Sequence, residues 1–438
     1  MVCEKQEANV CTKEEKAYDP LEHREVEKPN SNIRSTANLI KASLGSGLLA
    51  GPLAFSNSGW GVGLIGTMII GFICGHCIHI LVSTSRGVCQ LEKKPLLGYA
   101  DTCKAVFKHG PKALRPFSTA ASCFAIFALV CTHIGVCCIY TVLISDSAKQ
   151  LVDRYVPSFI IPIEYYCLIL LIPLCILCQI KHLKLLAIFS VLANILLVLT
   201  YFICLYYVFG DELTFSDKKV AGDPARLPAF ISTVIFAMEG IGVVMPVENT
   251  MKKPQNFLGF PSVLVVAMGC IVFLYSTLGL FGYLRYGDVL RGSITLNLPV
   301  DDWPAVCAKV FIATSIFLTF PLQFYVVIDI FTIHTQHYVK KNYVSIYQIV
   351  SRVVGVCFCV GIGIALPMLE QIINLVGAFF YSILGLMIPA IIETVFRWNN
   401  LGTCKWIFVK NIFIVVFGIT CLVSGCTVTI MDMEKRFE

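Results

Sequence analysis

The sequence predicts an all-α integral membrane protein with about eleven transmembrane helices. Of its 438 residues, 57% are hydrophobic and only 14% are charged, and the mean hydropathy is +0.77. A soluble domain cannot bury that much apolar surface, whereas a helix that crosses a bilayer needs roughly 20 consecutive apolar residues. The apolar runs here are continuous and do not alternate with polar residues, which excludes a transmembrane β-barrel.

Clusters of charged residues separate the apolar runs and divide the chain into three parts. A polar segment over 1–33 is expected to be a disordered cytosolic tail, because it has no signal-peptide pattern. Residues 34–431 form the transmembrane domain, and 432–438 form a short extracytosolic tail. The spans are expected at about 34–58, 60–85, 117–145, 159–180, 184–209, 228–247, 260–284, 304–334, 343–366, 370–393 and 406–431.

The distribution of Lys and Arg predicts the orientation. Most of the 34 basic residues fall in the first 33 residues and in the loops on the same side of the spans, such as the loop from Arg86 to Arg115. Basic loops stay in the cytosol, so the N-terminus is expected there. The net charge of +6 reflects this bias, and no nucleic-acid partner is expected; the bilayer is the partner that the composition indicates.

Two spans carry residues that interrupt a helix. The first contains Gly45-Ser46-Gly47 followed by Pro52, and the sixth contains Gly240-Ile241-Gly242 followed by Pro246. Glycine weakens a helix and proline removes one of its hydrogen bonds, and the helical rise places both breaks near the bilayer midplane. Matching breaks in two five-span halves are typical of secondary transporters built from inverted repeats. A 5+5 inverted repeat with a peripheral eleventh helix is therefore expected.

The breaks predict a substrate site, because non-helical backbone at this depth must line a cavity. Free N–H groups at a helix N-terminus suit a carboxylate, and free carbonyls at a helix C-terminus suit an ammonium, so a zwitterion fits. A packing role for the Gly47 to Gly51 face is the alternative for the first break alone. The site residues expected are Gly45, Ser46, Gly47 and Leu48 for the carboxylate, and Phe236, Ala237, Met238 and Gly240 for the ammonium.

Two ionisable residues at mid-membrane are candidates for proton coupling. An acid at this depth is costly, so Glu239 is expected to be a proton carrier or an acceptor for unwound backbone. His133 in the third span is either a structural histidine or a proton relay. Lys41 is expected to reach toward the cytosolic surface, and Glu248 is expected in an inner gate or a solvated turn. No resident cofactor, metal ligand or catalytic residue is expected.

Five segments resemble the proton-coupled amino acid transporters, a branch of the amino acid/auxin permeases. They are KASLGSGLLAGPLAF (41–55), FSVLANI (189–195), FAMEGIGVVMPVENTMKKP (236–254), GSITLNLP (292–299) and LQFYV (322–326), and YDPLEHR (18–24) resembles the tail of insect members. The resemblance implies a LeuT-like fold with broken helices 1 and 6, small neutral amino acids as substrates, and the plasma membrane or endolysosomes as location. It also implies that Tyr140 lines the cavity. Family members commonly have a proton-linked histidine where this chain has Asn38.

The predicted function is therefore secondary active transport of small neutral amino acids by alternating access, coupled to protons. The alternatives are a pH-independent facilitator, a sodium-coupled transporter that uses Thr314 or Ser315, and a low-turnover amino acid sensor with a cytosolic signalling partner. An enzyme is not expected, because the aqueous segments contain no nucleophile and base pair and no phosphate-binding loop.

Overall fold

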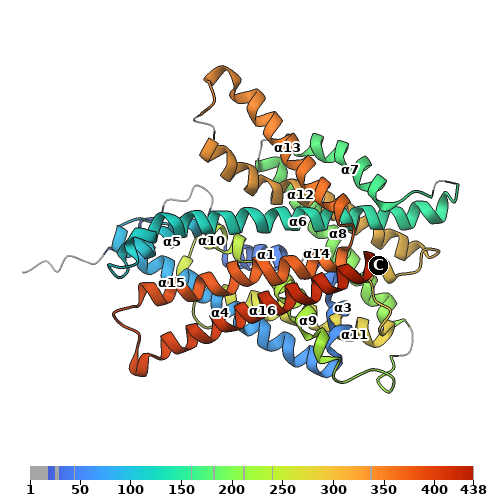
Figure 1. Cartoon of the computed structure of the whole chain (residues 1–438), viewed down its shortest axis with the longest axis horizontal. Helices are drawn as coiled ribbons and strands as arrows, with labels where there is room; N and C mark the ends of the chain where they lie inside the picture. The colour runs from blue at the N-terminus through green and yellow to red at the C-terminus, as the bar shows by residue number, and fades with distance from the viewer. Residues whose placement is uncertain are drawn as a thin grey trace, which may run out of the picture.

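The computed structural model describes residues 18–24, 29–43, 45–158, 160–180, 183–210, 213–238, 240–335 and 338–437. Within these ranges the protein is helical apart from turns, loops and one isolated backbone bridge (Figure 1). Most of the long helices lie roughly along the long axis of the molecule in Figure 1. This arrangement confirms the predicted all-α fold.

The first five predicted spans match the first half of the chain, with a break in the first of them. The last two helices of this half, which correspond to the fourth and fifth spans, follow the third span in the chain. Its helices are α1 (Asn32–Ser43), α2 (Ser46–Leu49), α3 (Gly51–Ser58), α4 (Trp60–Glu92), the short connecting α5 (Tyr99–His109), α6 (Ser118–Tyr155), α7 (Ile163–Leu177) and α8 (Leu183–Phe209).

The second half repeats this order, again with a break in its first span. The tenth span is one continuous rod in which a π-helical stretch, η7, joins two α-helices. The elements are α9 (Leu227–Met238), α10 (Ile241–Asn249), α11 (Val263–Tyr286), the turn η4 (Ile294–Asn297), α12 (Trp303–Thr335), α13 (Val344–Ala365), α14 (Leu369–Leu375), η7 (Val376–Met387), α15 (Ile388–Phe396) and α16 (Trp406–Phe437).

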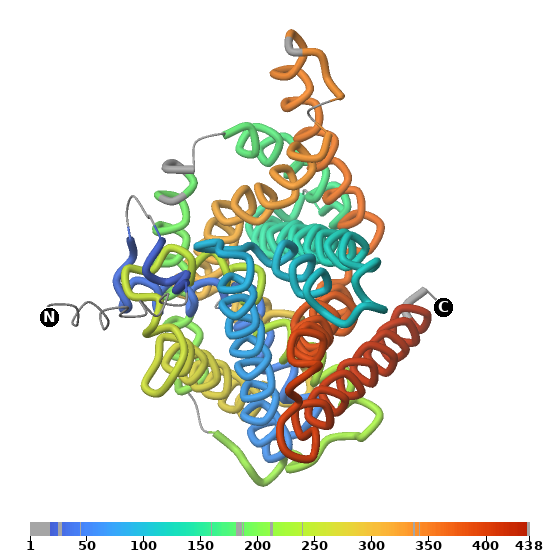
Figure 2. The backbone as a smooth tube through the Cα atoms, turned by 90° about the vertical axis from the view of Figure 1, so that its left-hand side faces the viewer, coloured from blue at the N-terminus to red at the C-terminus, as the bar shows by residue number. Residues whose placement is uncertain are grey.

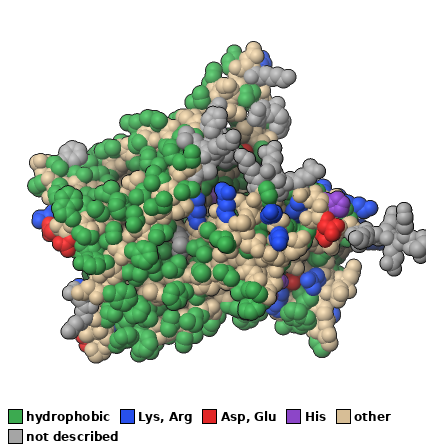
Figure 3. All heavy atoms as spheres, turned by 180° about the vertical axis from the view of Figure 1, so that it is seen from behind, with side chains coloured by type: hydrophobic (Ala, Val, Ile, Leu, Met, Phe, Trp, Pro, Cys, Tyr) green, Lys and Arg blue, Asp and Glu red, His purple; other side chains and the backbone are tan. Residues whose placement is uncertain are grey.

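Length and composition agree with the predicted number of spans. Among the described residues, nine helices are long and apolar enough to cross a membrane. The interrupted α1 to α3 and the shorter apolar helix α7 account for the other two predicted spans. Figure 3 shows the broad apolar surface that such a protein exposes to lipid, with charged side chains gathered toward the end that holds α5 and α10.

The packing separates a centre from a periphery. α12 packs along α6 and α8, and α9 packs against α3 and η7, so these helices surround the two breaks. α16 lies at the edge of the bundle in the end-on view of Figure 2 and exposes apolar side chains such as Phe413 and Val423. α7 and α13 pack together and project to the top of Figure 1.

Both predicted tails need correction. Residues 18–24 and 29–31 are not a disordered tail, because Arg24 and Asn30 make tertiary hydrogen bonds with the bundle. We call the end of the bundle that they contact the tail side. At the other terminus α16 continues to Phe437, so residues 432–437 extend the last helix instead of forming a separate tail.

Candidate substrate site

The two predicted breaks are in direct contact. A methyl group placed on Gly47 would lie 2.8 Å from the Cα atom of Ala237 and 3.3 Å from the ring of Phe236. A methyl group on Gly240 would lie 3.1 Å from the Ser43 hydroxyl. Carbon atoms in ordinary contact are about 3.5–4.0 Å apart, so the close approach of Gly47 to α9 requires a residue without a side chain.

The backbone leaves helical geometry at both breaks. Gly45 has a ψ of −149°, after which Ser46 and Gly47 begin α2 and have no carbonyl partner within that helix. Leu48 was predicted to offer a free amide as well, but its N–H donates to the Gly45 carbonyl at 3.3 Å, so that part of the prediction is wrong. Pro52 stands in the first turn of α3, where its missing N–H costs nothing.

The sixth span breaks in the corresponding way. α9 ends at Met238, and the Gly240 carbonyl accepts the N–H groups of Val243 and Val244 to start α10. The last carbonyl groups of α9, which have no partner within the helix, therefore lie at the break. Glu239, predicted as a coupling residue between these helices, lies outside the described residues.

A cavity of about 340 Å³ lies on the tail side of the breaks, between α1, α6, α8, α10 and α12. Its polar lining comes from all of these helices except α10, which contributes mainly apolar residues. The lining residues are Asn38, Lys41, Ala42, Gly45, His133, Tyr140, Ser190, Asn194, Leu197, Gly242, Val243, Pro246, Val247, Ser315, Ile316, Thr319, Leu322, Gln323, Tyr325 and Val326.

The predicted site residues divide between the cavity and the packed breaks. Gly45, Tyr140 and His133 line the cavity. The remaining ones are buried where the breaks meet, outside the cavity lining: Ser46, Gly47, Leu48, Phe236, Ala237, Met238 and Gly240. The described breaks therefore close the cavity on the side opposite the tail, and Gly45 is where the break reaches it.

His133 has one ring nitrogen fixed and the other turned to the cavity. Its Nδ1 lies 2.8 Å from the Leu129 carbonyl oxygen, four residues earlier on α6. A carbonyl can only accept, so Nδ1 carries the hydrogen, and in the neutral ring Nε2 is then an acceptor. A methyl group on Gly242 would lie 3.6 Å from Nε2, so this nitrogen faces α10 beside Gly242, which also lines the cavity. The bond of Nδ1 to the Leu129 carbonyl shows the structural role of His133, and the role of a proton relay stays a prediction.

Tyr140 lies between the first break and α12. A methyl group on Gly45 would lie 3.4 Å from its hydroxyl oxygen, and the hydroxyl lies beside the side chain of Gln323. Asn38 and Lys41 line the opposite wall from α1. Lys41, which was predicted to reach toward the cytosolic surface, has a partly buried side chain that borders the cavity.

The comparison with protein families decides the identity. The family model described as transmembrane amino acid transporter protein matches residues 28–431. The chain belongs to this family of amino acid transporters. It is therefore a multi-pass membrane protein and a transporter, not an enzyme.

The names of two individual relatives agree with this family. The transporter is 37% identical to the Drosophila melanogaster protein named proton-coupled amino acid transporter-like protein pathetic, over 96% of this chain and 89% of that protein. It is 25% identical to amino acid transporter ANT1 of Arabidopsis thaliana, over 92% of this chain and 93% of that one. Among solved structures, Mhp1, a nucleobase-cation-symport-1 family transporter, superposes with a TM-score of 0.50 at 12% identity, over 95% and 94% of the two chains. The LeuT-like fold is thus confirmed.

Several cavity residues of the transporter were not singled out from the sequence. Ser190 and Asn194 on α8 and Gln323 on α12 line the cavity, and all three occur in segments that carry the family resemblance. The signal in the sequence that could have identified them is that each is a polar side chain within an apolar span. The sodium-coupled alternative named the hydroxyls of Thr314 and Ser315. Ser315 lines the cavity, and its hydroxyl donates to the Ala193 carbonyl. Thr314 is exposed on the outside of the bundle.

Proposed function

We propose that this transporter carries small neutral amino acids together with protons by alternating access, with its tail side in the cytosol. The observation that carries the proposal is the orientation of His133, whose Nδ1 is fixed by a backbone carbonyl while Nε2 faces the cavity. An imidazole nitrogen that accepts no other hydrogen can take up and release a proton, and this supports coupling through Nε2. The name of the Drosophila relative supports the same coupling.

The size of the cavity and the lack of acidic side chains in its described lining support small substrates without a cationic side chain. Its volume of about 340 Å³ is at the lower end of the range of about 300–1,000 Å³ typical of ligand sites. No Asp or Glu occurs among the described lining residues, so nothing described there would pair with a cationic side chain. Of the residues at the two breaks that were predicted to bind substrate, Gly45 lines the cavity, so the zwitterion is proposed to bind with its carboxylate toward Gly45.

The charge distribution supports the orientation. Basic side chains gather at the tail side, as Figure 3 shows for one face, and cytosolic surfaces of membrane proteins are rich in Lys and Arg. The plasma membrane and endolysosomes are the proposed locations. In both, an acidic lumen or exterior would drive proton-coupled uptake into the cytosol.

The test is uptake and current for glycine, alanine, glutamate and arginine, at outside pH of about 5.5 and 7.5, on either side of the pKa of histidine. We expect uptake of alanine and glycine to rise in acid and to carry inward current. His133→Gln should flatten the pH dependence. His334→Gln is the matched control, because that histidine makes the same 2.8 Å contact with the carbonyl four residues before it but lies exposed at the end of α12.

The alternatives give different results in the same assay. Uptake that ignores pH and carries no current identifies a facilitator. Uptake that falls when sodium is replaced identifies a sodium-coupled transporter. Preference for glutamate or arginine over alanine contradicts the proposed substrate class.

A further inference from the structure

Lys41 brings a positive charge to the wall of the cavity. It lies on α1 between Asn38 and Ala42, and all three residues line the cavity together with Gly45. Residues three and four apart share one face of a helix, so these residues form a single strip that leads along α1 to the first break. At helical rise, Lys41 lies only about 6 Å along the axis from Gly45.

The charge of Lys41 is not neutralised by the described protein. Its side chain is partly buried. Among the described residues, the Lys41 ammonium has no hydrogen-bond or ion-pair partner, and the cavity lining contains no Asp or Glu. A charge that is withdrawn from water is costly unless it is paired. An anion in the cavity would therefore be stabilised by this ammonium.

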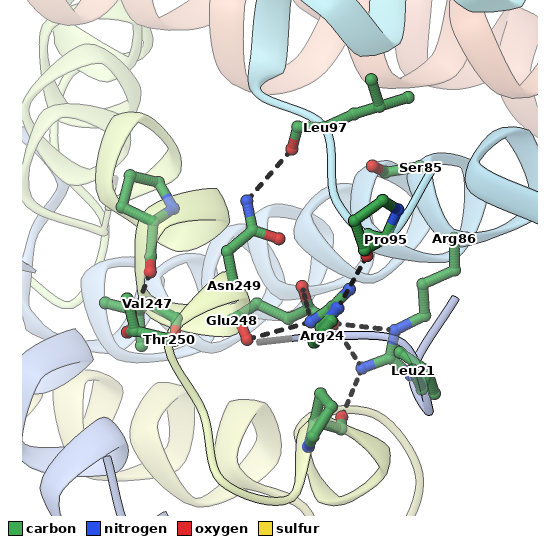
Figure 4. Close-up of polar contacts among 12 residues, drawn as sticks. Leu21, Arg24, Ser85, Arg86, Pro95, Leu97, Val247, Glu248, Asn249 and Thr250 are labelled. Atoms are coloured by element: carbon green, nitrogen blue, oxygen red, sulfur yellow. Dashed lines mark hydrogen bonds and ion pairs between the residues drawn. The ribbon is translucent and has the colours of Figure 1, made fainter. Parts of the chain in front are cut away.

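Glu248 shows how the same bundle pairs a charge that it buries (Figure 4). Its side chain at the end of α10 is 1% exposed, so the alternative of a solvated turn is wrong. One of its carboxylate oxygens accepts from Arg24 at 2.9 Å, and the other accepts from Arg86 of α4 at 3.0 Å. Lys41 has no such described partner, and it faces the cavity instead.

The walls formed by α8 and α12 present hydrogen-bond acceptors to the same cavity. The side-chain N–H of Asn194 donates to the Ser190 carbonyl, which leaves Oδ1 of Asn194 as an acceptor. The Ser315 hydroxyl donates to the Ala193 carbonyl at 2.6 Å, and the Thr319 hydroxyl donates to the Ser315 carbonyl at 2.8 Å. A hydroxyl has one hydrogen and two lone pairs, so both oxygens can still accept. The donor on α1 and the acceptors on α8 and α12 thus give the cavity two different ends.

This polarity matches a zwitterion. A carboxylate accepts hydrogen bonds and has the charge opposite to that of Lys41, whereas an ammonium group only donates. A hydrogen bond between two charged groups is roughly twice as strong as one between neutral groups. A ligand that has an ammonium group but no carboxylate would be repelled by Lys41 and would find no acid in the described lining.

We propose that Lys41 is a specificity-determining residue of the cavity: its ammonium binds the substrate carboxylate beside Gly45 and excludes ligands that are cationic and have no carboxylate. The acceptors of Asn194, Ser315 and Thr319 then bind the ammonium group of the substrate. The inference rests on the proposed amino acid substrate and names the residue that recognises it. It depends neither on alternating access nor on which ion is coupled.

The test measures binding to the purified full chain in detergent. A ligand that binds the folded state raises the melting temperature, and the dependence on ligand concentration gives the affinity. The probes are alanine and alaninamide, which keeps the ammonium and methyl groups but has a neutral amide in place of the carboxylate. The unmodified chain should bind alanine more tightly than alaninamide, on the order of tenfold or more, which is the value of a hydrogen bond to a charged group.

Lys41→Met keeps an unbranched side chain without the charge. It should weaken alanine binding by about 10- to 100-fold and remove most of the preference for alanine over alaninamide. Lys41→Arg keeps the charge and should keep the preference. Lys104→Met is the matched control, because Lys104 is exposed on α5 and lies outside the described cavity lining; it should bind both ligands as the unmodified chain does.

Two outcomes would overturn the role of Lys41. One is an unmodified chain that binds alaninamide as tightly as alanine, a result that needs no variant to fold. The other is a Lys41→Met chain that keeps both the affinity for alanine and the preference, because the ammonium would then serve another partner.

Binding in detergent needs no transport, so it separates this inference from the proposed function. If alanine binds with the expected preference but its uptake ignores pH, proton coupling fails and the role of Lys41 stands. If the unmodified chain does not bind alanine at all, the proposed substrate class fails and the role of Lys41 fails with it.

Discussion

The contact between the two breaks makes Gly47 the sharpest test of the site. Gly47→Ala adds one methyl group, and the structure places that carbon 2.8 Å from the Cα atom and 3.1 Å from the Cβ atom of Ala237, with the ring of Phe236 at 3.3 Å. The nearest obstacle is backbone, which cannot rotate out of the way as the end of a long side chain can. The methyl group therefore has to push α2 away from α9.

The size of the effect follows from these distances. Contacts between carbon atoms are favourable at about 3.5–4.0 Å, so α2 and α9 would have to separate by roughly 0.7 Å or more. An extra methylene in a well-packed interior costs typically about 1–3 kcal/mol. If the strain falls on one state of the transport cycle, it changes the equilibrium between states by about 5–150-fold. We expect alanine uptake to fall by about tenfold or more, and the melting temperature in detergent to decrease.

The assay compares Gly47→Ala with alanine substitutions at glycines that have space. Gly269→Ala on α11 and Gly361→Ala on α13 are the controls, because a methyl group at either position meets no atom within 4 Å. Each should keep the uptake and melting temperature of the unmodified chain, since alanine favours a helix over glycine. Unchanged uptake and melting temperature in Gly47→Ala, at equal amounts in the membrane, would refute the contact between the breaks.

Three further predictions concern other parts of the molecule. Lys309→Met should lower the free energy of unfolding by about 1–3 kcal/mol. The fully buried Lys309 ammonium donates to the Gln150 side chain at 2.7 Å and to the Thr295 carbonyl at 2.6 Å, and its loss leaves both acceptors unpaired. An unchanged melting temperature in detergent would contradict this prediction. Burial raises the pKa of the Cys103 thiol in α5 to about 12, so almost no thiolate is present at a pH of about 7.5. Mass spectrometry after maleimide treatment should therefore find Cys103 unlabelled. Rapid labelling would show that α5 opens. Asn38→His adds a titratable ring to the cavity wall and should steepen the pH dependence of alanine uptake; an unchanged profile would show that coupling does not use this position.

The sequence was sufficient to predict the features that local chemistry determines. Glycine and proline break a helix wherever they occur in it, so the interruptions at Gly45 and Gly240 could be located before any packing was known. The length of apolar runs likewise determines how many helices can cross a bilayer. The broken first and sixth spans and the 5+5 arrangement therefore followed from residues that act on their own helix.

The remaining features depend on which helices become neighbours, and one sequence does not contain that information. The spacing of Ser190 and Asn194 shows that they share a face of α8, but not that this face meets the cavity. The sequence likewise does not show that Lys41 borders the cavity. For Glu248 it left an inner gate and a solvated turn open, because nothing near this residue in sequence explains its burial, and its partner Arg24 lies 224 residues away. A partner so far away in the sequence cannot be predicted from the residues around Glu248.

The same geometry indicates which contacts persist when the cavity changes its access. Gly47 packs on Ala237, and Gly240 packs near Ser43, so the broken spans hold each other at both breaks and should move as one body. Their contacts with α6 are of another kind: Gly45 faces the hydroxyl of Tyr140, and Gly242 faces the ring of His133. With glycine at both positions, no side chain of Gly45 or Gly242 stands between the broken spans and α6 there. Under the proposed alternating access, His133 would lie where the broken spans move against α6, so that a proton on Nε2 would meet a different environment in each state, as the proposed coupling requires.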